Sequence, residues 1–514
     1  MASGAAIISM SPRRKLALTI AMMAATVTQV LDTTIANVAL PHMQASLGAT
    51  QETVAWVLTS YIIAAAIATP LTGWLANRFG RKQLFLTAVI GFTATSAMCG
   101  LSTSLEMMVA SRALQGVFGA FIIPISQAAM YDINPREKHA QAMAIWGMAV
   151  MIAPILGPVV GGWLTDTLSW HWTFFINVPI GIFAAAGTWL LMPRETPSPR
   201  RFDYLGFAML ALGLSALQLF LDRGAQKDWL ESGEIIIELG LAIAAAWVFI
   251  IHSATAKNPL FPIALWRDRN FVIALFLVMV TSGVMFGGSA LMPPMLQRLL
   301  GYSTIDAGLI TAPRGVGMMI SMIAAGRLAK YIDGRAMIAG GLIVTALSVK
   351  MMTHFSLTMD AETIILAGLV QGLGFGFVVL PLNLLAFVTL EPKLRTEASS
   401  LYSLSRSLGG SVMISITTAL LARSIQIAHA GLGTHITDET MPYLASPMIQ
   451  SMGITASSVL EFFDAEINRQ ALMIAYLNDF QFMYWATLAA LPSLLLLRSP
   501  KRVQVGDSPA AAIE

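Results

Sequence analysis

The segment 16–38 reads LALTIAMMAATVTQVLDTTIANV and directly follows Arg13, Arg14 and Lys15. An apolar run of about 20 residues is long enough to cross the hydrocarbon core of a membrane as a helix. The run is longer than the core of a signal peptide, which has about 7–15 residues, and no convincing cleavage site follows it. The sequence therefore predicts a first membrane-spanning helix rather than a cleaved leader.

The composition of the whole chain extends this interpretation. Of 514 residues, 56% are hydrophobic and only 11% are charged, whereas soluble proteins have about 25% charged residues. Most of the exterior is therefore expected to face lipid. The net charge of +3 is too small to suggest nucleic-acid binding. The single cysteine, Cys99, excludes an intramolecular disulfide and a cysteine-clustered metal site.

Further apolar stretches predict about fourteen spanning helices in an all-α polytopic membrane protein. After the first, they are expected near residues 53–75, 83–101, 105–130, 140–165, 172–192, 204–221, 235–252, 271–295, 304–327, 336–355, 362–390, 397–424 and 477–497.

The distribution of basic residues predicts the orientation of these helices. With the N-terminus inside, 22 lysine and arginine residues fall in the inner loops and 5 in the outer loops. Basic residues near span ends resist translocation. The N- and C-termini are both predicted to be cytoplasmic.

Three pairs of similar motifs recur at offsets of about 252 to 256 residues, which indicates an internal duplication. The exits LPHM at 40–43 and MPPM at 292–295 correspond, as do the loops at 73–81 and 326–335, and Gln115-Gly116 corresponds to Gln371-Gly372. The motifs predict two parallel six-helix repeats with two inserted helices between them.

The predicted organisation has five parts. They are an N-terminal half at 1–193, the two inserted helices at 194–256, a C-terminal half at 257–424 and 477–498, a periplasmic loop at 425–476, and a cytoplasmic tail at 499–514.

Two such halves are typical of secondary transporters, which hold substrate near mid-membrane and rock one half against the other. The sequence has no Gly-x-x-x-x-Gly-Lys-Ser/Thr loop for ATP. Transport is therefore expected to use an ion gradient or to run downhill.

Asp32 is an acidic residue well inside the first predicted helix, and Arg112 reaches a similar depth in the fourth. Charges in the membrane interior are costly and are functional candidates by default. The two residues could exchange partners while Asp32 binds and releases a proton, or they could form a static clamp between two helices. At the repeat position of Asp32 the second half has Val284 and Met285, so carboxylate coupling is expected only in the N-terminal half.

Other polar residues are candidates for a substrate cavity. Gln29, Thr33 and Asn37 share one face of the first helix with Asp32. Arg314 and Arg406 are deep charges that either line the substrate path or pair with backbone carbonyls. The predicted cavity residues are Gln29, Thr33, Asn37, Gln115, Arg314 and Arg406.

Five motifs in order resemble the fourteen-helix drug:proton antiporters of the major facilitator superfamily. They are LDTTIANVALP at 31–41, GWLANRFGRK at 73–82, RALQG at 112–116, GPVVGG at 157–162 and WHWTFFINVPIG at 170–181. The resemblance covers nearly the whole chain and implies that Asp32 takes part in proton coupling with support from Arg112.

The resemblance also implies conformational gating by two of these motifs. Gly157, Pro158, Gly161 and Gly162 would form the antiporter signature of the fifth helix, although Ala153 stands where the family often has glycine. The alternative is ordinary glycine-mediated helix packing.

The loop between the second and third helices would latch the gate through Gly73, Asn77, Arg78, Gly80 and Arg81. The superfamily usually has an acid at the position of Asn77, and asparagine can form hydrogen bonds but no ion pair. The basic residues of this loop could equally be simple inside-positive anchors.

The long outer segment at 425–476 contains a predicted amphipathic helix near 457–475. The resemblance suggests that the segment docks a periplasmic membrane-fusion adaptor of the EmrA type, which engages an outer-membrane channel of the TolC type. The alternative is a lid that packs on its own transporter.

The sequence thus predicts a proton-coupled exporter of diverse hydrophobic compounds in a bacterial inner membrane, with no cofactor and no metal. One alternative is a dedicated exporter of a single metabolite, lipid or siderophore. A polytopic membrane enzyme is a third possibility, but the seven histidines are scattered without ligand spacing.

Overall fold

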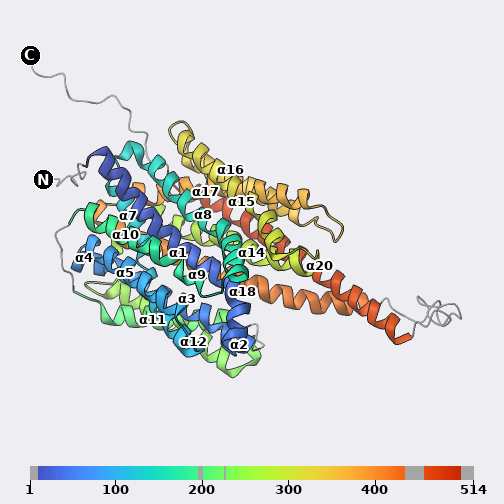
Figure 1. The fold of residues 1–514 in the computed structure, drawn as a ribbon. Helices are drawn as coiled ribbons and strands as arrows, with labels where there is room; N and C mark the ends of the chain where they lie inside the picture. The colour runs from blue at the N-terminus through green and yellow to red at the C-terminus, as the bar shows by residue number, and fades with distance from the viewer. Residues whose placement is uncertain (1–9, 195–200, 225–226, 228, 435–455, 499–514) are drawn as a thin grey trace, which may run out of the picture.

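The structure, a computed structural model, describes residues 10–194, 201–224, 227, 229–434 and 456–498. In this part of the chain the regular elements are helices. The predicted tail at 499–514 and part of the predicted outer loop lie outside the described residues. Figure 1 shows long helices running side by side, with α18 and α20 projecting beyond the bundle.

The N-terminal half contains six crossings, several of them built from two consecutive helices. Its helices are α1 (Pro12–Ser46), α3 (Trp56–Ala68) with α4 (Thr72–Phe79), α5 (Arg81–Gly100), α6 (Leu105–Gly119) with α7 (Ile122–Asp132), α8 (His139–Thr167), and α9 (Trp172–Phe175) with α10 (Asn177–Leu191).

The two inserted crossings and the C-terminal half follow. Their helices are α11 (Tyr204–Arg223), α12 (Gly233–Thr255), α14 (Arg269–Arg298), α15 (Thr304–Leu328), α16 (Gly334–Met352), α17 (Ala361–Val388), α18 (Arg395–Gly433) and α20 (Ala456–Ala490). Two short helices precede longer ones. The helix α2 (Gln51–Val54) precedes α3, and α13 (Ile263–Arg267) precedes α14.

Thirteen segments of the described chain are long and apolar enough to cross a membrane. They match the first thirteen predicted spans. The fourteenth prediction, at 477–497, falls on α20, where Asn478, Asp479 and Gln481 lower the mean hydropathy. Because α20 packs on α14, α16 and α18, it completes the C-terminal half.

The two halves use the same helix pairings, as a duplication requires. In the first half α1 packs on α8, α3 on α6, and α10 on α5; in the second, α14 packs on α18, α15 on α17, and α20 on α16. The halves meet through α8 with α15 and through α7 and α4 with α18. The inserted helices α11 and α12 pair with each other, and α11 also contacts α3 and α18.

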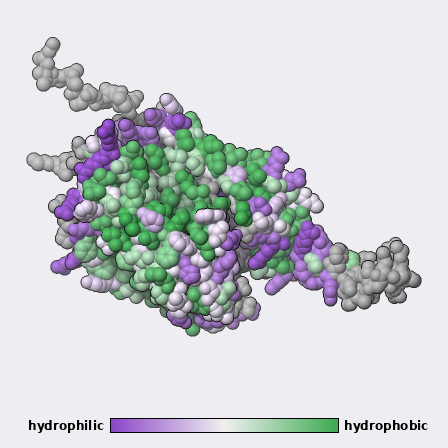
Figure 2. Space-filling model, viewed as in Figure 1, coloured by the Kyte–Doolittle hydropathy of each residue, from purple (hydrophilic) through white to green (hydrophobic). Residues whose placement is uncertain are grey.

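The exterior has the polarity of a membrane protein. Figure 2 shows apolar residues over the middle of the visible face, while hydrophilic residues gather at the upper left edge, in the lower part of this face and on the projecting helices. Large apolar side chains on α12 are exposed, among them Ile237, Ile243 and Trp247. Without lipid these side chains would contact water at a free-energy cost of roughly 25 cal/mol per Å².

The outer segment differs from the prediction of a separate amphipathic helix at 457–475. The structure has one continuous helix, α20, from Ala456 into the membrane part, and α18 also runs on to Gly433. The physical reason is that no proline or glycine interrupts residues 456–490, so the amphipathic pattern and the apolar span join without a break.

Candidate functional site

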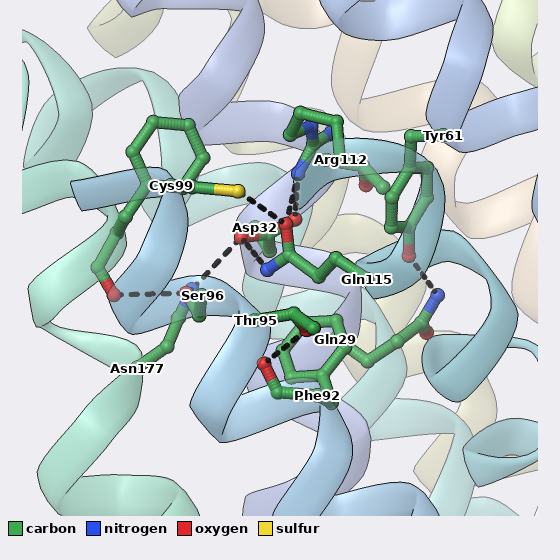
Figure 3. A network of polar contacts seen from close by, with 12 residues as sticks. Gln29, Asp32, Tyr61, Phe92, Thr95, Ser96, Cys99, Arg112, Gln115 and Asn177 are labelled. Carbon is green, nitrogen blue, oxygen red and sulfur yellow. Dashed lines mark hydrogen bonds and ion pairs between the residues drawn. The ribbon is translucent and has the colours of Figure 1, made fainter. Parts of the chain in front are cut away.

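The carboxylate of Asp32 lies at the centre of a buried polar cluster inside the N-terminal half (Figure 3). Its Oδ2 accepts a hydrogen bond from Arg112 Nη1 at 2.6 Å. Its Oδ1 accepts from Gln115 Nε2 at 2.9 Å and from Asn177 Nδ2 at 2.8 Å. The donors come from α6 and α10, so two helices of the same half converge on a single acid on α1.

Arg112 is held by more than its ion pair with Asp32. Its Nε donates to Val57 O at 3.2 Å and its Nη1 to Gln115 Oε1 at 2.7 Å. Its Cζ lies 4.3 Å from the centroid of the Tyr61 ring, which is the geometry of a cation–π contact. The guanidinium therefore keeps favourable partners even when Asp32 is neutral.

A close approach of two helices places the Tyr61 ring over Arg112. A Cβ on Gly116 would overlap the backbone oxygen of Tyr61, so only glycine lets α6 come this near to α3. The hydroxyl of Tyr61 accepts a hydrogen bond from Gln29 Nε2 at 3.0 Å. Gln29 is therefore linked to the Asp32 cluster through Tyr61 (Figure 3).

The other residues of the predicted polar stripe do not join this cluster. Thr33 donates to Val30 O in its own helix, and Asn37 is exposed. The side chains of one helix point in different directions, so they cannot all contact the same neighbouring helix. Of these residues, Asp32 contacts both α6 and α10.

A cavity between the halves has about 500 Å³ of empty space, including its open mouth. It is lined mainly by apolar side chains such as Trp146, Val278 and Met285, together with Asn383, Tyr402 and Arg406. Of the six predicted cavity residues, Arg406 lines it. In the described part of the chain no ion pair joins Arg406 to an acid, so its charge is available to a bound group.

Arg314 occupies the interior of the C-terminal half instead. Its Nη1 donates to Gln371 Oε1 at 3.4 Å, and its Nη2 contacts Ser289 Oγ. In the described residues no carboxylate lies within ion-pair distance of Arg314. It is thus not the mirror image of Arg112, although both face a glutamine of the repeated Gln-Gly motif.

At the end of the bundle where α1 begins, which we call the N-terminal face, polar contacts join the two halves. Asn77 Nδ2 donates to Glu397 Oε1 at 2.6 Å. Asp132 forms ion pairs with Arg81 of its own half and with Arg395 of the other, the latter at 2.6 Å. The acid missing at position 77 is therefore supplied across the interface by Glu397.

A second layer of contacts lies further inside the same interface. Gln127 Nε2 donates to Asn383 Oδ1 at 2.7 Å, and Ser399 Oγ donates to Gln127 Oε1 at 2.6 Å. Tyr131 donates to Asn383 O at 3.0 Å. These bonds close the N-terminal face beneath the cavity.

The predicted gating loop lies at this face. A Cβ on Gly73 would overlap Glu397, so glycine permits the contact between α4 and α18. Gly80 has φ of +87° and ends α4, a conformation that glycine adopts at little cost. The Arg78 guanidinium lies 5.5 Å from the centroid of the Trp74 ring rather than against an acid.

The predicted signature of the fifth helix lies in α8, which packs on α1. A Cβ on Gly157 would overlap Thr34 Oγ1, and one on Gly161 would lie 3.3 Å from Ile35 Cγ2. Gly162 has no atom within 4 Å of such a Cβ. Pro158 lies within α8 between these glycines.

Several residues of these sites were not predicted as site residues. Asn177 belongs to the motif at 170–181, but the sequence of this motif does not indicate a contact with Asp32. Asp132, Arg395 and Glu397 sit at span ends, where charges are common. The expectation that carboxylate coupling is confined to the N-terminal half stays a prediction. Asp479 in α20, which is fully buried, was not singled out as a site residue. Its signal was an acid inside an apolar segment, the same signal that identified Asp32.

Comparison with known proteins places this geometry in a family. The sequence pattern of the Major Facilitator Superfamily matches residues 22–414. The chain is 36% identical over 466 residues to the Multidrug export protein EmrB of Escherichia coli (strain K12), covering 89% of this chain and 90% of that protein. It is also 36% identical to the Fatty acid resistance protein FarB of Neisseria gonorrhoeae, covering 87% and 89% of the two chains.

Among solved structures, the human organic anion transporter MFSD10 (TETRAN) has a similar fold. The TM-score is 0.57 with 13% sequence identity, and the match covers 93% of this chain and 100% of that one. The predicted resemblance and the predicted all-α polytopic fold are confirmed, and membership of a transporter family argues against the membrane-enzyme alternative. The chain belongs to the Major Facilitator Superfamily, with EmrB-type exporters among its relatives.

Proposed function

We propose that this protein is a multidrug exporter of a bacterial inner membrane that exchanges hydrophobic compounds for protons by alternating access. The observation that carries the proposal is the buried ion pair of Asp32 and Arg112, whose carboxylate has three donors and whose guanidinium has alternative partners. The similarity to the Multidrug export protein EmrB of Escherichia coli supports multidrug export.

The geometry around Arg112 supports a proton-binding step at Asp32. When water reaches the cluster, one carboxylate oxygen of Asp32 takes a proton and the ion pair with Arg112 ends. Arg112 remains bound to Val57 O, Gln115 Oε1 and the face of Tyr61. The positive charge therefore keeps partners while the acid is neutral, and loss of the proton restores the ion pair.

The contacts between the halves support alternating access. With both termini in the cytoplasm, the N-terminal face is the cytoplasmic gate, and in this conformation Asn77, Asp132 and their partners close it. Opening this gate exposes the cavity lined by Arg406 to the cytoplasm, where substrate enters. Outward release then follows when these contacts form again.

A direct test compares proton-driven drug transport by wild type and Asp32→Asn in proteoliposomes. We expect the variant to fold and bind substrate but to lose transport driven by a pH gradient, because asparagine cannot carry the proton. Asp166→Asn is a matched control, because Asp166 is an exposed acid on α8 of the same half. Coupled transport by a folded Asp32→Asn protein would exclude this role for Asp32.

The projecting helices support a partner outside the membrane. At 1.5 Å per residue, α18 with 39 residues and α20 with 35 are about 50–60 Å long, whereas the hydrocarbon core is about 30 Å thick. We propose that their outer ends dock a membrane-fusion adaptor of the EmrA type, which engages a TolC-type channel. Cross-linking of outer-end cysteine variants of α20 to the adaptor tests this, with α12 variants as controls.

A dedicated exporter of one anionic lipid-like compound is the second candidate. The unpaired Arg406 in an apolar cavity and the similarity to FarB favour it. Accumulation of chemically varied compounds in cells with and without the protein separates the candidates, since a dedicated exporter changes the level of only one class.

A further inference from the structure

Asp479 is an acidic side chain in the C-terminal half that the mechanism above does not use. Asp479 lies in α20, and 0% of its surface is exposed. Among the residues that the structure describes, neither of its carboxylate oxygens has a hydrogen-bond partner. Burying an ionised carboxylate without donors costs far more free energy than burying the neutral acid.

No charge on the neighbouring helices compensates Asp479. The basic residues in the membrane part of these helices are Arg298 on α14, Lys350 on α16, and Arg406 and Arg423 on α18. The structure records no ion pair between Asp479 and any of these residues. Lys350 instead lies over the Tyr484 ring, with Nζ 5.6 Å from its centroid.

Gln371 and Arg314 lie near the side chain of Met483 on α20. A Cβ on Gly288 would be 3.5 Å from Met483 Cε, 3.6 Å from Arg314 Nη1 and 3.8 Å from Gln371 Nε2. Gln371 is 1% exposed, and its Nε2 has no hydrogen-bond partner. Asp479 precedes Met483 by one helical turn on the same side of α20, about 6 Å along the axis.

The repeat shows what Gln371 lacks. Its counterpart Gln115 accepts from Arg112 and donates through Nε2 to the carboxylate of Asp32. Gln371 likewise accepts from Arg314, but its Nε2 has no acceptor. The C-terminal half therefore holds an arginine, a glutamine with a spare donor, and a carboxyl group without donors.

We propose that Asp479 is a second proton-carrying group of the transport cycle, with Gln371 and Arg314 as its partners in the alternate conformation. This rests on the proton-coupled function proposed above. In the conformation described, Asp479 carries a proton. In the alternate conformation its carboxyl group accepts hydrogen bonds from Gln371 Nε2 and from Arg314.

The proton step balances without any further reactant. The O–H bond of the Asp479 carboxylic acid breaks, the proton passes to water, and the carboxylate accepts hydrogen bonds from Gln371 and Arg314. In the reverse step water supplies the proton. The two halves thus hold their acids in opposite protonation states within one conformation.

The first test measures protons moved per substrate molecule in proteoliposomes. Asp479→Asn is expected to lower this ratio by about one, because one titratable group has been removed. Asp360→Asn is the matched control, since Asp360 is an exposed acid of the same half whose side chain caps no helix. An unchanged ratio in a folded Asp479→Asn protein overturns the proposal.

The second test needs no transport. Infrared spectra of the purified full chain are expected to show the carbonyl band of a protonated carboxylic acid, absent in Asp479→Asn and retained in Asp32→Asn. Identical spectra in wild type and Asp479→Asn overturn the proposal even if that variant transports poorly. If instead wild type moves no protons with substrate, the proposed function fails while the infrared band still reports the state of Asp479.

Discussion

The two halves of this fold hold their buried acids in contrasting ways. In the N-terminal half Asp32 accepts three hydrogen bonds, one of them from Arg112. In the C-terminal half Asp479 accepts none, although Arg314 and Gln371 belong to the same half. The helix pairings are thus alike in the two halves, but the paired acid lies on the first helix of one half and the unpaired acid on the last helix of the other.

The largest expected effect comes from removing the cation of the paired acid. Arg112→Leu leaves Asp32 buried without its positive partner, and breaking a buried pair costs about 3–5 kcal/mol. Arg314→Leu is the matched change, and we expect a smaller loss because no carboxylate pairs with Arg314 in the described structure. Thermal unfolding in detergent measures both, and equal losses would contradict the contrast between the halves.

The next effect concerns the contacts that hold the halves together. Arg395→Ala removes the ion pair that Arg395 forms with Asp132 of the other half. The side chain of Arg395 is 10% exposed and that of Asp132 is 18% exposed. A hydrogen bond to a charged group contributes about 1.5–3 kcal/mol, so the population should shift toward conformations in which the N-terminal face is open. Spin-label distances across the N-terminal face measure this. Lys393→Ala, which removes the exposed pair with Glu391, is expected to leave the distances unchanged.

Glycine packing gives a third comparison between the repeats. A Cβ on Gly157 would overlap the Thr34 side chain, whereas a Cβ on Gly409 in α18 would overlap the backbone of Met279. Overpacking costs about 1–3 kcal/mol, and we expect Gly409→Ala to lie at the upper end because backbone cannot rotate away. Gly162→Ala, with open space around it, should be neutral or slightly stabilising. Unfolding midpoints of the three variants test this order.

The smallest effect separates the two glutamines. Gln115→Met removes bonds to both Asp32 and Arg112, whereas Gln371→Met removes one long bond from Arg314. A hydrogen bond to a charged group contributes about 1.5–3 kcal/mol at good geometry and less at 3.4 Å, so the first change should cost more. The free energies of unfolding of both variants test this order. A larger loss for Gln371→Met than for Gln115→Met would contradict it.

Much of the fold could be predicted because membrane crossing is encoded locally. A run of apolar residues identifies a helix wherever its neighbours lie, and thirteen spans followed from this rule. The rule also predicted the span at 477–497 on α20, but the signal was weaker there because Asn478, Asp479 and Gln481 lower the hydropathy, and the buried acid was not singled out.

The candidate site could be predicted only in part. Asp32 and Arg112 were recognisable alone, because a charge in a membrane helix is rare and costly. Their partners were not, since Asn177 lies 145 residues from Asp32 and Glu397 lies 320 residues from Asn77 in the sequence. No spacing rule connects positions so far apart.

The sequence by itself determined the family, the membrane crossings, the duplication and the presence of deep charges, because these depend on residue type and order. The tertiary structure alone decided that Asp32 has three donors, that Asp479 has none, and that Asn77 meets an acid from the other half. The physical reason is that a hydrogen bond depends on where helices from distant parts of the chain come within about 3 Å of each other.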